Sequence, residues 1–116
     1  MKLNDFIEGT DGIVLSLAEH NGAYSAAFKN AFDWLSRIEG KLWRYKPMLL
    51  LSTSPGPRGG QSVMDLALSR FPFNGGNITG SMIFPSFGQN FNNGTISDIE
   101  LKDKLNGLVE QFSKTI

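Results

Sequence analysis

Three short apolar runs recur along the chain, and each is followed by a polar or glycine-rich loop. They cover residues 12–17 (GIVLSL), 48–53 (MLLLST) and 78–84 (ITGSMIF). Their apolarity is largely continuous instead of alternating, which is typical of strands covered on both faces, as in parallel sheets. The pattern therefore predicts three buried strands.

Helical spacing of apolar side chains marks the segments around these runs. The most regular helix is predicted over residues 24–38, where Phe28 and Phe32 share one face. Lys29 and Asp33 lie at i, i+4 spacing on another face, which suits solvent. Further helices are predicted over residues 1–10, over 61–71 and from residue 97 to the C-terminal end.

Two of these helices carry start signals. Ser97 with Glu100 forms a capping box before the last helix. Ser62 with Asp65 three residues later predicts the start of the helix over 61–71.

Alternating helices and strands predict an α/β fold with a parallel sheet and right-handed crossovers. If the strands lie in chain order, the first two crossover helices cover one face and the last helix covers the other, which makes three layers. One helix hardly covers a face, and the first strand keeps an open edge. We therefore expect residues 1–116 to form a single partial domain, which either is incomplete or relies on another chain to complete it.

Composition narrows the function classes. Eleven basic and eleven acidic side chains cancel, so there is no electrostatic case for nucleic acid or an acidic membrane surface as a partner. The absence of Cys excludes thiolate catalysis and Cys-ligated metals, and it fits a cytoplasmic location. The single His20 cannot build a multi-histidine metal site, and no apolar run is long enough to span a membrane.

The first candidate loop follows the first strand. Asn and Gly permit a tight turn, whose N–H groups could bond the carbonyls and ring nitrogens of a flat heterocycle. The alternative, which composition alone favours, is a simple strand-to-helix turn with Asn21 or Ser25 as the helix N-cap. The candidate residues are Glu19, His20, Asn21, Gly22, Tyr24 and Ser25, with the rings of His20 and Tyr24 available to stack.

The second candidate loop follows the second strand and has the sequence SPGPRGG. Its prolines stiffen it, its glycines let a ligand approach the backbone, and its arginine could meet a phosphate or carboxylate. It lacks the Gly-Lys-Ser/Thr ending of a P-loop, and the alternative is a rigid connector. The candidate residues are Ser54, Pro55, Gly56, Arg58, Gly59 and Gly60.

Aromatic residues raise two further alternatives. Phe84, Phe87 and Phe91 could wall a pocket or seal the end of the sheet, and we favour the seal. Trp34 and Trp43 lie off the main helical stripe, which suits either a partner surface or the edge of the core.

No catalytic residue is predicted. The serines that end the strands lack a nucleophile-elbow context, and Glu19 stands alone among the three loops, so paired carboxylates are not visible either. The loops suit a planar ligand that supplies the chemistry itself.

The two loops carry a family resemblance. The first block matches at Glu19, Asn21, Gly22, Lys29, Asn30, Ala31, Asp33 and Trp34, and the second at Ser54, Pro55, Gly56, Gly59 and Gly60. Both blocks, in this order and at this separation, resemble the NAD(P)H-dependent FMN reductases, which are flavodoxin-like proteins. Ala18 and His20 stand where that family has Pro and Tyr.

The resemblance implies that the isoalloxazine ring of FMN lies against residues 19–25 and 54–60. It implies hydride transfer from NADPH or NADH to the flavin, and then reduction of a quinone, another flavin, an azo compound or a metal oxyanion. It also implies a dimer or tetramer in which the helix over 24–38, with Trp34, lies near the subunit contact.

The family's first two strands and its phosphate-binding loop have no counterpart in this sequence. We therefore expect a ring site without a phosphate site, and low flavin affinity and activity for the chain alone. Two alternatives remain open, a non-catalytic flavodoxin-like interaction module and a flavodoxin-type electron carrier. Such carriers are usually strongly acidic, and the net charge of zero argues against the second.

Overall fold

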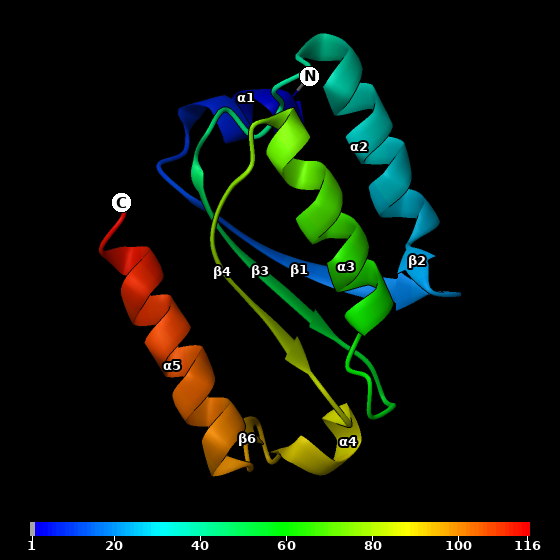
Figure 1. Ribbon diagram of the computed structural model, residues 1–116, viewed down its shortest axis with the longest axis vertical. Coiled ribbons are helices and arrows are strands. Elements are labelled where there is room, and N and C mark those ends of the chain that lie inside the picture. Colours follow the sequence, from blue (N-terminus) through cyan, green and yellow to red (C-terminus); the bar gives the residue numbers. More distant parts are fainter. Residues whose placement is uncertain (1) are drawn as a thin grey trace.

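A four-stranded sheet forms the centre of the computed structural model, which describes residues 2–116 (Figure 1). Strands β1, β3 and β4 are parallel and lie side by side in chain order, while the short β2 pairs antiparallel with β1. The predicted α/β class and the three parallel strands are confirmed. The bounds are β1 Ile13–His20, β2 Ala23–Tyr24, β3 Pro47–Thr53 and β4 Asn77–Phe84.

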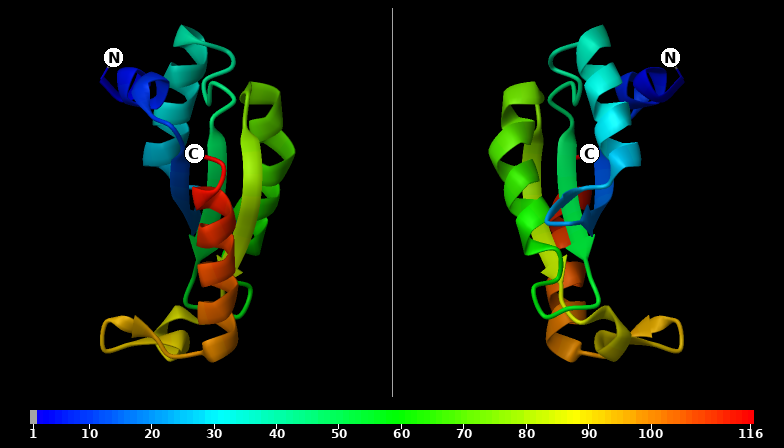
Figure 2. Two further views of the ribbon diagram at one scale, coloured as in Figure 1. Left: turned by 90° about the vertical axis from the view of Figure 1, so that its left-hand side faces the viewer. Right: turned by 90° about the vertical axis from the view of Figure 1, so that its right-hand side faces the viewer.

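Helices cover the two faces unequally. Helices α2 and α3 lie on one face of the sheet and α5 lies alone on the other, as the two views of Figure 2 show. The predicted three layers are therefore present. The bounds are α1 Lys2–Gly9, α2 Ala26–Ile38, α3 Gln61–Arg70, η1 Phe71–Asn74, α4 Phe87–Asn90, β5 Phe91–Asn92, β6 Thr95–Ile96 and α5 Ile99–Ser113.

The first strand and helix differ from the prediction. β1 continues to His20, and α2 begins at Ala26 instead of residue 24. The reason is a two-residue turn: Asn21 and Gly22 both have positive φ, 53° and 77°, which reverses the chain into the β1–β2 hairpin. Ser25 is then the N-cap of α2, where its hydroxyl accepts the Phe28 N–H at 3.1 Å.

The predicted start of α3 at Ser62 is wrong. The N-cap is Gly60, which has no side chain to donate or accept, and the helix ends at Arg70. The last helix has a side-chain cap one residue later than predicted, because Asp98 accepts the Leu101 N–H at 2.9 Å. The segment predicted as a loop over 85–94 contains α4 and the first strand of the small β5–β6 hairpin.

An aromatic cluster forms the core between the sheet and the helices α2 and α3. Phe71 is its hub and is fully buried. The ring centroids of Tyr24, Phe28, Phe32 and Trp43 all lie 4.9–6.2 Å from that of Phe71. The two tryptophans therefore separate: Trp43 belongs to the core, while Trp34 is 64% exposed.

The α5 face is covered only in part. Leu108 occupies the space where a Cβ on Gly80 would lie, so α5 packs closely on β4. On β1, the alternate residues Val14, Ser16 and Ala18 are exposed. Within residues 2–116, the outer edge of β1 is paired only at Glu19 and His20, so the expected open edge is present. No helix in this part of the chain is long and apolar enough to cross a membrane.

Replacing Phe71 with Ala tests the aromatic core. Loss of a fully buried ring that contacts four others should lower the free energy of unfolding by about 3–5 kcal/mol. Urea denaturation measures the change. Phe73→Ala is the matched control, because Phe73 is 68% exposed and its loss should cost less than about 1 kcal/mol. Equal losses for the two variants would contradict the assignment of Phe71 as the hub.

Candidate functional site

The carboxyl ends of the three parallel strands place both candidate loops at one edge of the sheet (Figure 1). The loop over 54–60 is attached to the end of β4 by backbone bonds. The N–H of Ser86 donates to the carbonyl of Gly56 at 2.8 Å, and that of Phe87 donates to the carbonyl of Ser54 at 3.1 Å. Ligands of parallel α/β sheets bind at this edge.

Glycines let the loop fold back tightly over the end of β3. Gly59 and Gly60 have φ of +60° and +83°, and both are buried. A Cβ on Gly59 would lie 2.8 Å from the backbone N of Pro85, and one on Gly60 would lie 2.9 Å from the side chain of Ser52. The buried Ser52 hydroxyl donates to the carbonyl of Gly59 at 3.0 Å, with the carbonyl of Gly60 at 3.2 Å. The two glycines are therefore required by both backbone conformation and space.

Glu19 connects the hairpin to helix α3. Its Oε1 accepts the backbone N–H of Val63 at 2.8 Å, across 44 positions of sequence. Val63 lies in the first turn of α3, where N–H groups have no partner inside the helix. The half-buried side chain of Glu19 therefore points toward α3.

The rest of the hairpin divides into an exposed tip and a packed base. His20, Asn21 and Gly22 are exposed at the tip. The Tyr24 ring stacks on Phe71 with 6.2 Å between centroids, and its hydroxyl is buried without a hydrogen-bond partner in the described chain. Burial raises the pKa of Tyr24, and the nearby charge of Arg70 opposes that shift. The structure gives Tyr24 a packing role, and a contact between its ring and a ligand stays a prediction.

Ser25 and Arg58 have local partners of different kinds. Ser25 is part-buried as the cap of α2, so the expected N-cap is confirmed, although the loop is a β-hairpin and not a simple strand-to-helix turn. The exposed guanidinium of Arg58 donates to the hydroxyl of Ser62 at 3.1 Å. Among residues 2–116, no carboxylate lies within ion-pair distance of Arg58, so its charge is available to an anion. Pro55 is exposed beside it, and Ser54 and Gly56 are half-buried.

The three phenylalanines line a cavity, which supports the pocket wall that the sequence left as the less favoured alternative. A cavity of about 200 Å³ lies between the sheet and the α4–α5 region, lined by Phe84, Phe87 and Phe91 with residues of β3 and α5. The rings of Phe87 and Phe91 stack at 5.0 Å. Sequence spacing alone could not separate the two interpretations, because the outcome depends on how far β5 and β6 carry Phe91 from the sheet.

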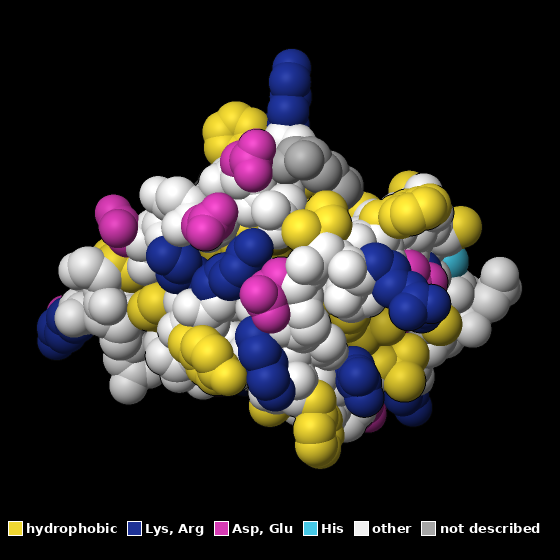
Figure 3. All heavy atoms as spheres, turned by 90° about the horizontal axis from the view of Figure 1, so that it is seen from above, with side chains coloured by type: hydrophobic (Ala, Val, Ile, Leu, Met, Phe, Trp, Pro, Cys, Tyr) yellow, Lys and Arg dark blue, Asp and Glu magenta, His cyan; other side chains and the backbone are white. Residues whose placement is uncertain are grey.

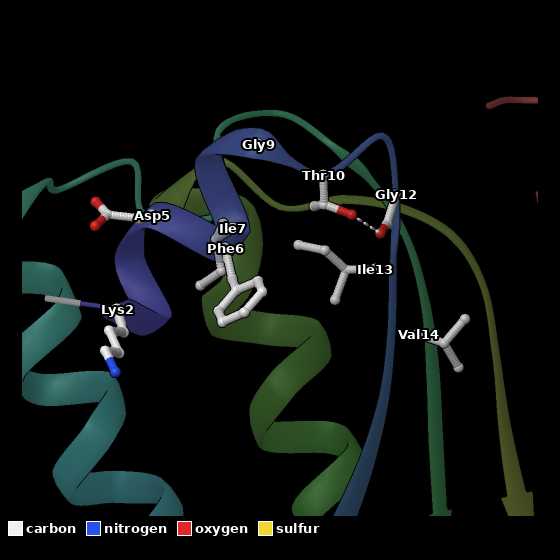
Figure 4. Close-up of a pocket in the computed structure, with 9 residues that line it drawn as sticks. All are labelled: Lys2, Asp5, Phe6, Ile7, Gly9, Thr10, Gly12, Ile13 and Val14. Carbon is white, nitrogen blue, oxygen red and sulfur yellow. Dashed lines mark hydrogen bonds between the residues drawn. The ribbon is translucent and has the colours of Figure 1, made fainter.

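A second, wider hollow lies elsewhere, beside the open edge of β1. It measures about 930 Å³ and is lined by α1 and the start of β1, including Phe6, Ile13 and Val14 (Figure 4). Thr10 donates to the carbonyl of Gly12 at 3.0 Å and shapes its rim. This hollow lies at the amino end of β1, away from both candidate loops.

The surface at that end of the molecule has no dominant charge. Figure 3 shows basic, acidic and hydrophobic side chains interspersed over it. In the described residues, no three His, Cys, Asp or Glu side chains gather in a metal-binding group.

A match to a known protein family covers most of the chain. Residues 1–88 match the family described as NADPH-dependent FMN reductase. The chain belongs to this family. The resemblance carried by the two loop motifs is confirmed.

Relatives agree with this assignment. The chain is 36% identical over 64 residues to the NADPH azoreductase of Bacillus sp. (strain OY1-2), a match that covers 55% of the chain and 34% of that protein. It is 27% identical over 124 residues to the quinone reductase of Escherichia coli (strain K12), covering 98% of the chain and 63% of that protein. The chain thus spans between about a third and two thirds of the lengths of these relatives.

A solved structure supports the fold. FerB, a flavoenzyme NAD(P)H:(acceptor) oxidoreductase from Paracoccus denitrificans, superposes with a TM-score of 0.75 at 25% identity. The match covers 98% of this chain and 67% of that one. The predicted flavodoxin-like arrangement of the sheet is confirmed.

Replacing Gly60 with Ala tests the geometry of the second loop. The positive φ and the contact with Ser52 should together lower the free energy of unfolding by about 1–3 kcal/mol. Thermal unfolding measures the loss. Gly40→Ala is the matched control, because nothing lies within 4 Å of its added Cβ and its φ is ordinary. If both variants unfold at the wild-type temperature, the tight path of the loop is wrong.

Proposed function

We propose that this chain forms the flavin-ring site of an NAD(P)H-dependent FMN reductase. The observation that carries the proposal is the meeting of both family motifs at one strand edge, where Glu19 on the first loop bonds the helix that follows the second. The azoreductase and FerB are named as enzymes that use NADPH or NAD(P)H. The names of the two curated relatives give an azo compound and a quinone as acceptors. We therefore propose NADPH or NADH as the hydride donor and the same acceptor classes here.

The exposed groups suit a flat ring. Asn21 and Gly22 present backbone at the hairpin tip, and the exposed Pro55, beside the half-buried Gly56, presents a stiff surface in the second loop. Arg58 adds the positive charge that a flavin or nicotinamide phosphate needs. When bound, the flavin supplies the hydride chemistry, and the chain orients the ring and limits its contact with water.

No titratable side chain of the two loops is placed as an acid or base. The carboxylate of Glu19 is occupied by the bond to Val63, and His20 is exposed on the hairpin. A cytoplasmic location, which the lack of Cys favours, belongs to the same proposal.

A flavin titration tests the proposed function. Lumiflavin, which is the ring system without ribityl phosphate, should bind weakly and be quenched, and FMN should bind somewhat more tightly through Arg58. Arg58→Gln should remove the advantage of FMN and leave lumiflavin unaffected, which makes lumiflavin the internal control. Fluorescence of each flavin at increasing protein concentration gives both affinities.

Hydride transfer is measured next, with excess FMN, NADPH and a soluble quinone. NADPH oxidation that depends on protein supports the reductase. Flavin binding without NADPH oxidation would favour a flavodoxin-type carrier, and a stable oligomer that ignores both flavins would favour an interaction module.

We also propose that α2 forms a contact between copies of the chain. Trp34 is 64% exposed and Ile38, four residues later on the same face, is 50% exposed. An exposed tryptophan beside an aliphatic residue suits the centre of an interface.

Trp34→Glu should raise the dimer dissociation constant at least about tenfold, because a buried charge replaces an aromatic anchor. Sedimentation velocity over a range of concentrations measures the constant. Ile99→Glu is the control, since Ile99 is 72% exposed on α5, away from α2. A wild-type chain that stays monomeric throughout would refute the contact.

A further inference from the structure

Helix α3 lacks the devices that normally stabilise a helix N-terminus. Its N-cap, Gly60, has no side chain, and its first turn contains no acidic residue. Unpaired N–H groups and the positive end of the helix dipole both favour an oxygen acceptor with negative charge at this place. Such a group is therefore needed from another part of the chain.

Glu19 supplies that group. Its Oε1 lies 2.8 Å from the N of Val63, the third residue of α3, which is the donor that a capping side chain normally satisfies. The side chain is half-buried, so the bond is partly shielded from water. Glu19 thus caps α3 from the neighbouring strand.

The hydrogen bond between Glu19 and Val63 links the two candidate loops, because each partner lies next to one of them. Glu19 is paired with Tyr24 in the hairpin and stands two residues before the Asn21–Gly22 turn. Val63 stands three residues after Gly60, where the second loop ends. Among the side-chain hydrogen bonds of the described chain, this one alone joins residues 19–25 to residues 54–63.

The second loop is held differently on its other side. Bonds from Ser86 and Phe87 attach it to the end of β4, away from β1. On the side that faces β1, the side-chain hydrogen bond to the hairpin therefore depends on Glu19.

We propose that Glu19 is a positioning residue that sets the separation of the two loops by capping α3 and does not contact the flavin. The part that concerns flavin rests on the proposed function. The coupling of the loops does not, because it concerns the chain alone.

The test compares Glu19→Ala and Glu19→Gln with wild type in the full chain. Glu19→Ala removes the acceptor, whereas Glu19→Gln keeps an oxygen at the same place and removes only the charge. Asp98→Ala is the matched control, because it removes an equivalent cap, at 2.9 Å from Leu101 N, from helix α5.

Amide hydrogen exchange is the first readout and needs no flavin. Glu19→Ala should speed exchange about tenfold at Val63 and at Gly59 and Gln61, whose N–H groups bond the carbonyls of Gly56 and Arg58, since loss of a cap changes the local equilibrium by about this factor. Glu19→Gln should restore most of the protection. Asp98→Ala should speed exchange at Leu101 and leave the second loop unchanged.

Lumiflavin affinity is the second readout. It should fall about tenfold in Glu19→Ala, recover most of the loss in Glu19→Gln, and stay at the wild-type value in Asp98→Ala. Recovery of lumiflavin affinity in Glu19→Gln would show that Glu19 acts by positioning the loops, because a direct contact between its charge and the flavin would be lost in this variant. If Glu19→Ala fails to fold, Glu19→Gln carries both readouts, with the protection of Val63 near wild type as the expected result.

Three other outcomes would contradict either the positioning role of Glu19 or the proposed function, and each can be told apart from the expected results. Unchanged exchange at Gly59 and Gln61 in Glu19→Ala overturns the proposal whether or not flavin binds. Protection restored in Glu19→Gln without recovery of lumiflavin affinity also overturns it, because Glu19 would then act on the flavin directly. If wild type binds no lumiflavin, the proposed function fails, and the exchange result alone decides the coupling.

Discussion

The parallel pairing of β1, β3 and β4 is the constraint on which the rest of the molecule depends. Parallel neighbours need a crossover, and a helix supplies it, so every strand enters the sheet from the same end. The carboxyl ends of the strands, and the loops that follow them, therefore lie at the same edge of the sheet even if the loops do not contact one another. The fully buried Met48, Leu49 and Leu50 of β3 anchor this arrangement at the centre of the sheet.

Shared position is not enough for a site, because loops at one edge can still move independently. Hydrogen bonds and close packing hold the two loops in fixed positions. Ser52 and the positive-φ glycines hold the second loop against β3, and Glu19 ties its following helix to the hairpin. The same arrangement leaves the outer edge of β1 and part of the α5 face open.

The pattern of apolar residues predicted the strands and helices that depend on residues close together in the sequence. The apolar runs marked all three parallel strands, because a strand covered on both faces has no polar alternation to blur the signal. The end of β1 was missed by three residues, since the polar Glu19 and His20 look like loop. The Asn21–Gly22 pair is a hairpin signal that could have found β2.

Features that join distant segments were not predictable from pattern. Nothing near Ser62 shows that its helix is capped by a residue 44 positions before Val63, and Ser62 itself looked like the better cap. The cavity beside Phe84 likewise depends on the path of β5 and β6. The candidate loop residues came from two motifs in a fixed order, and their meeting at one edge follows from topology. Their contact with a flavin stays a prediction.

The most direct test of this account is a map of backbone amide chemical shifts as lumiflavin is added to the chain. We expect the largest changes to fall together on Asn21 and Gly22 in the hairpin and on Gly56, Gly59 and Gly60 in the second loop. Changes confined to the open edge of β1 at Ile13–Ala18, or to the cavity of Phe84 and Phe87, would contradict it.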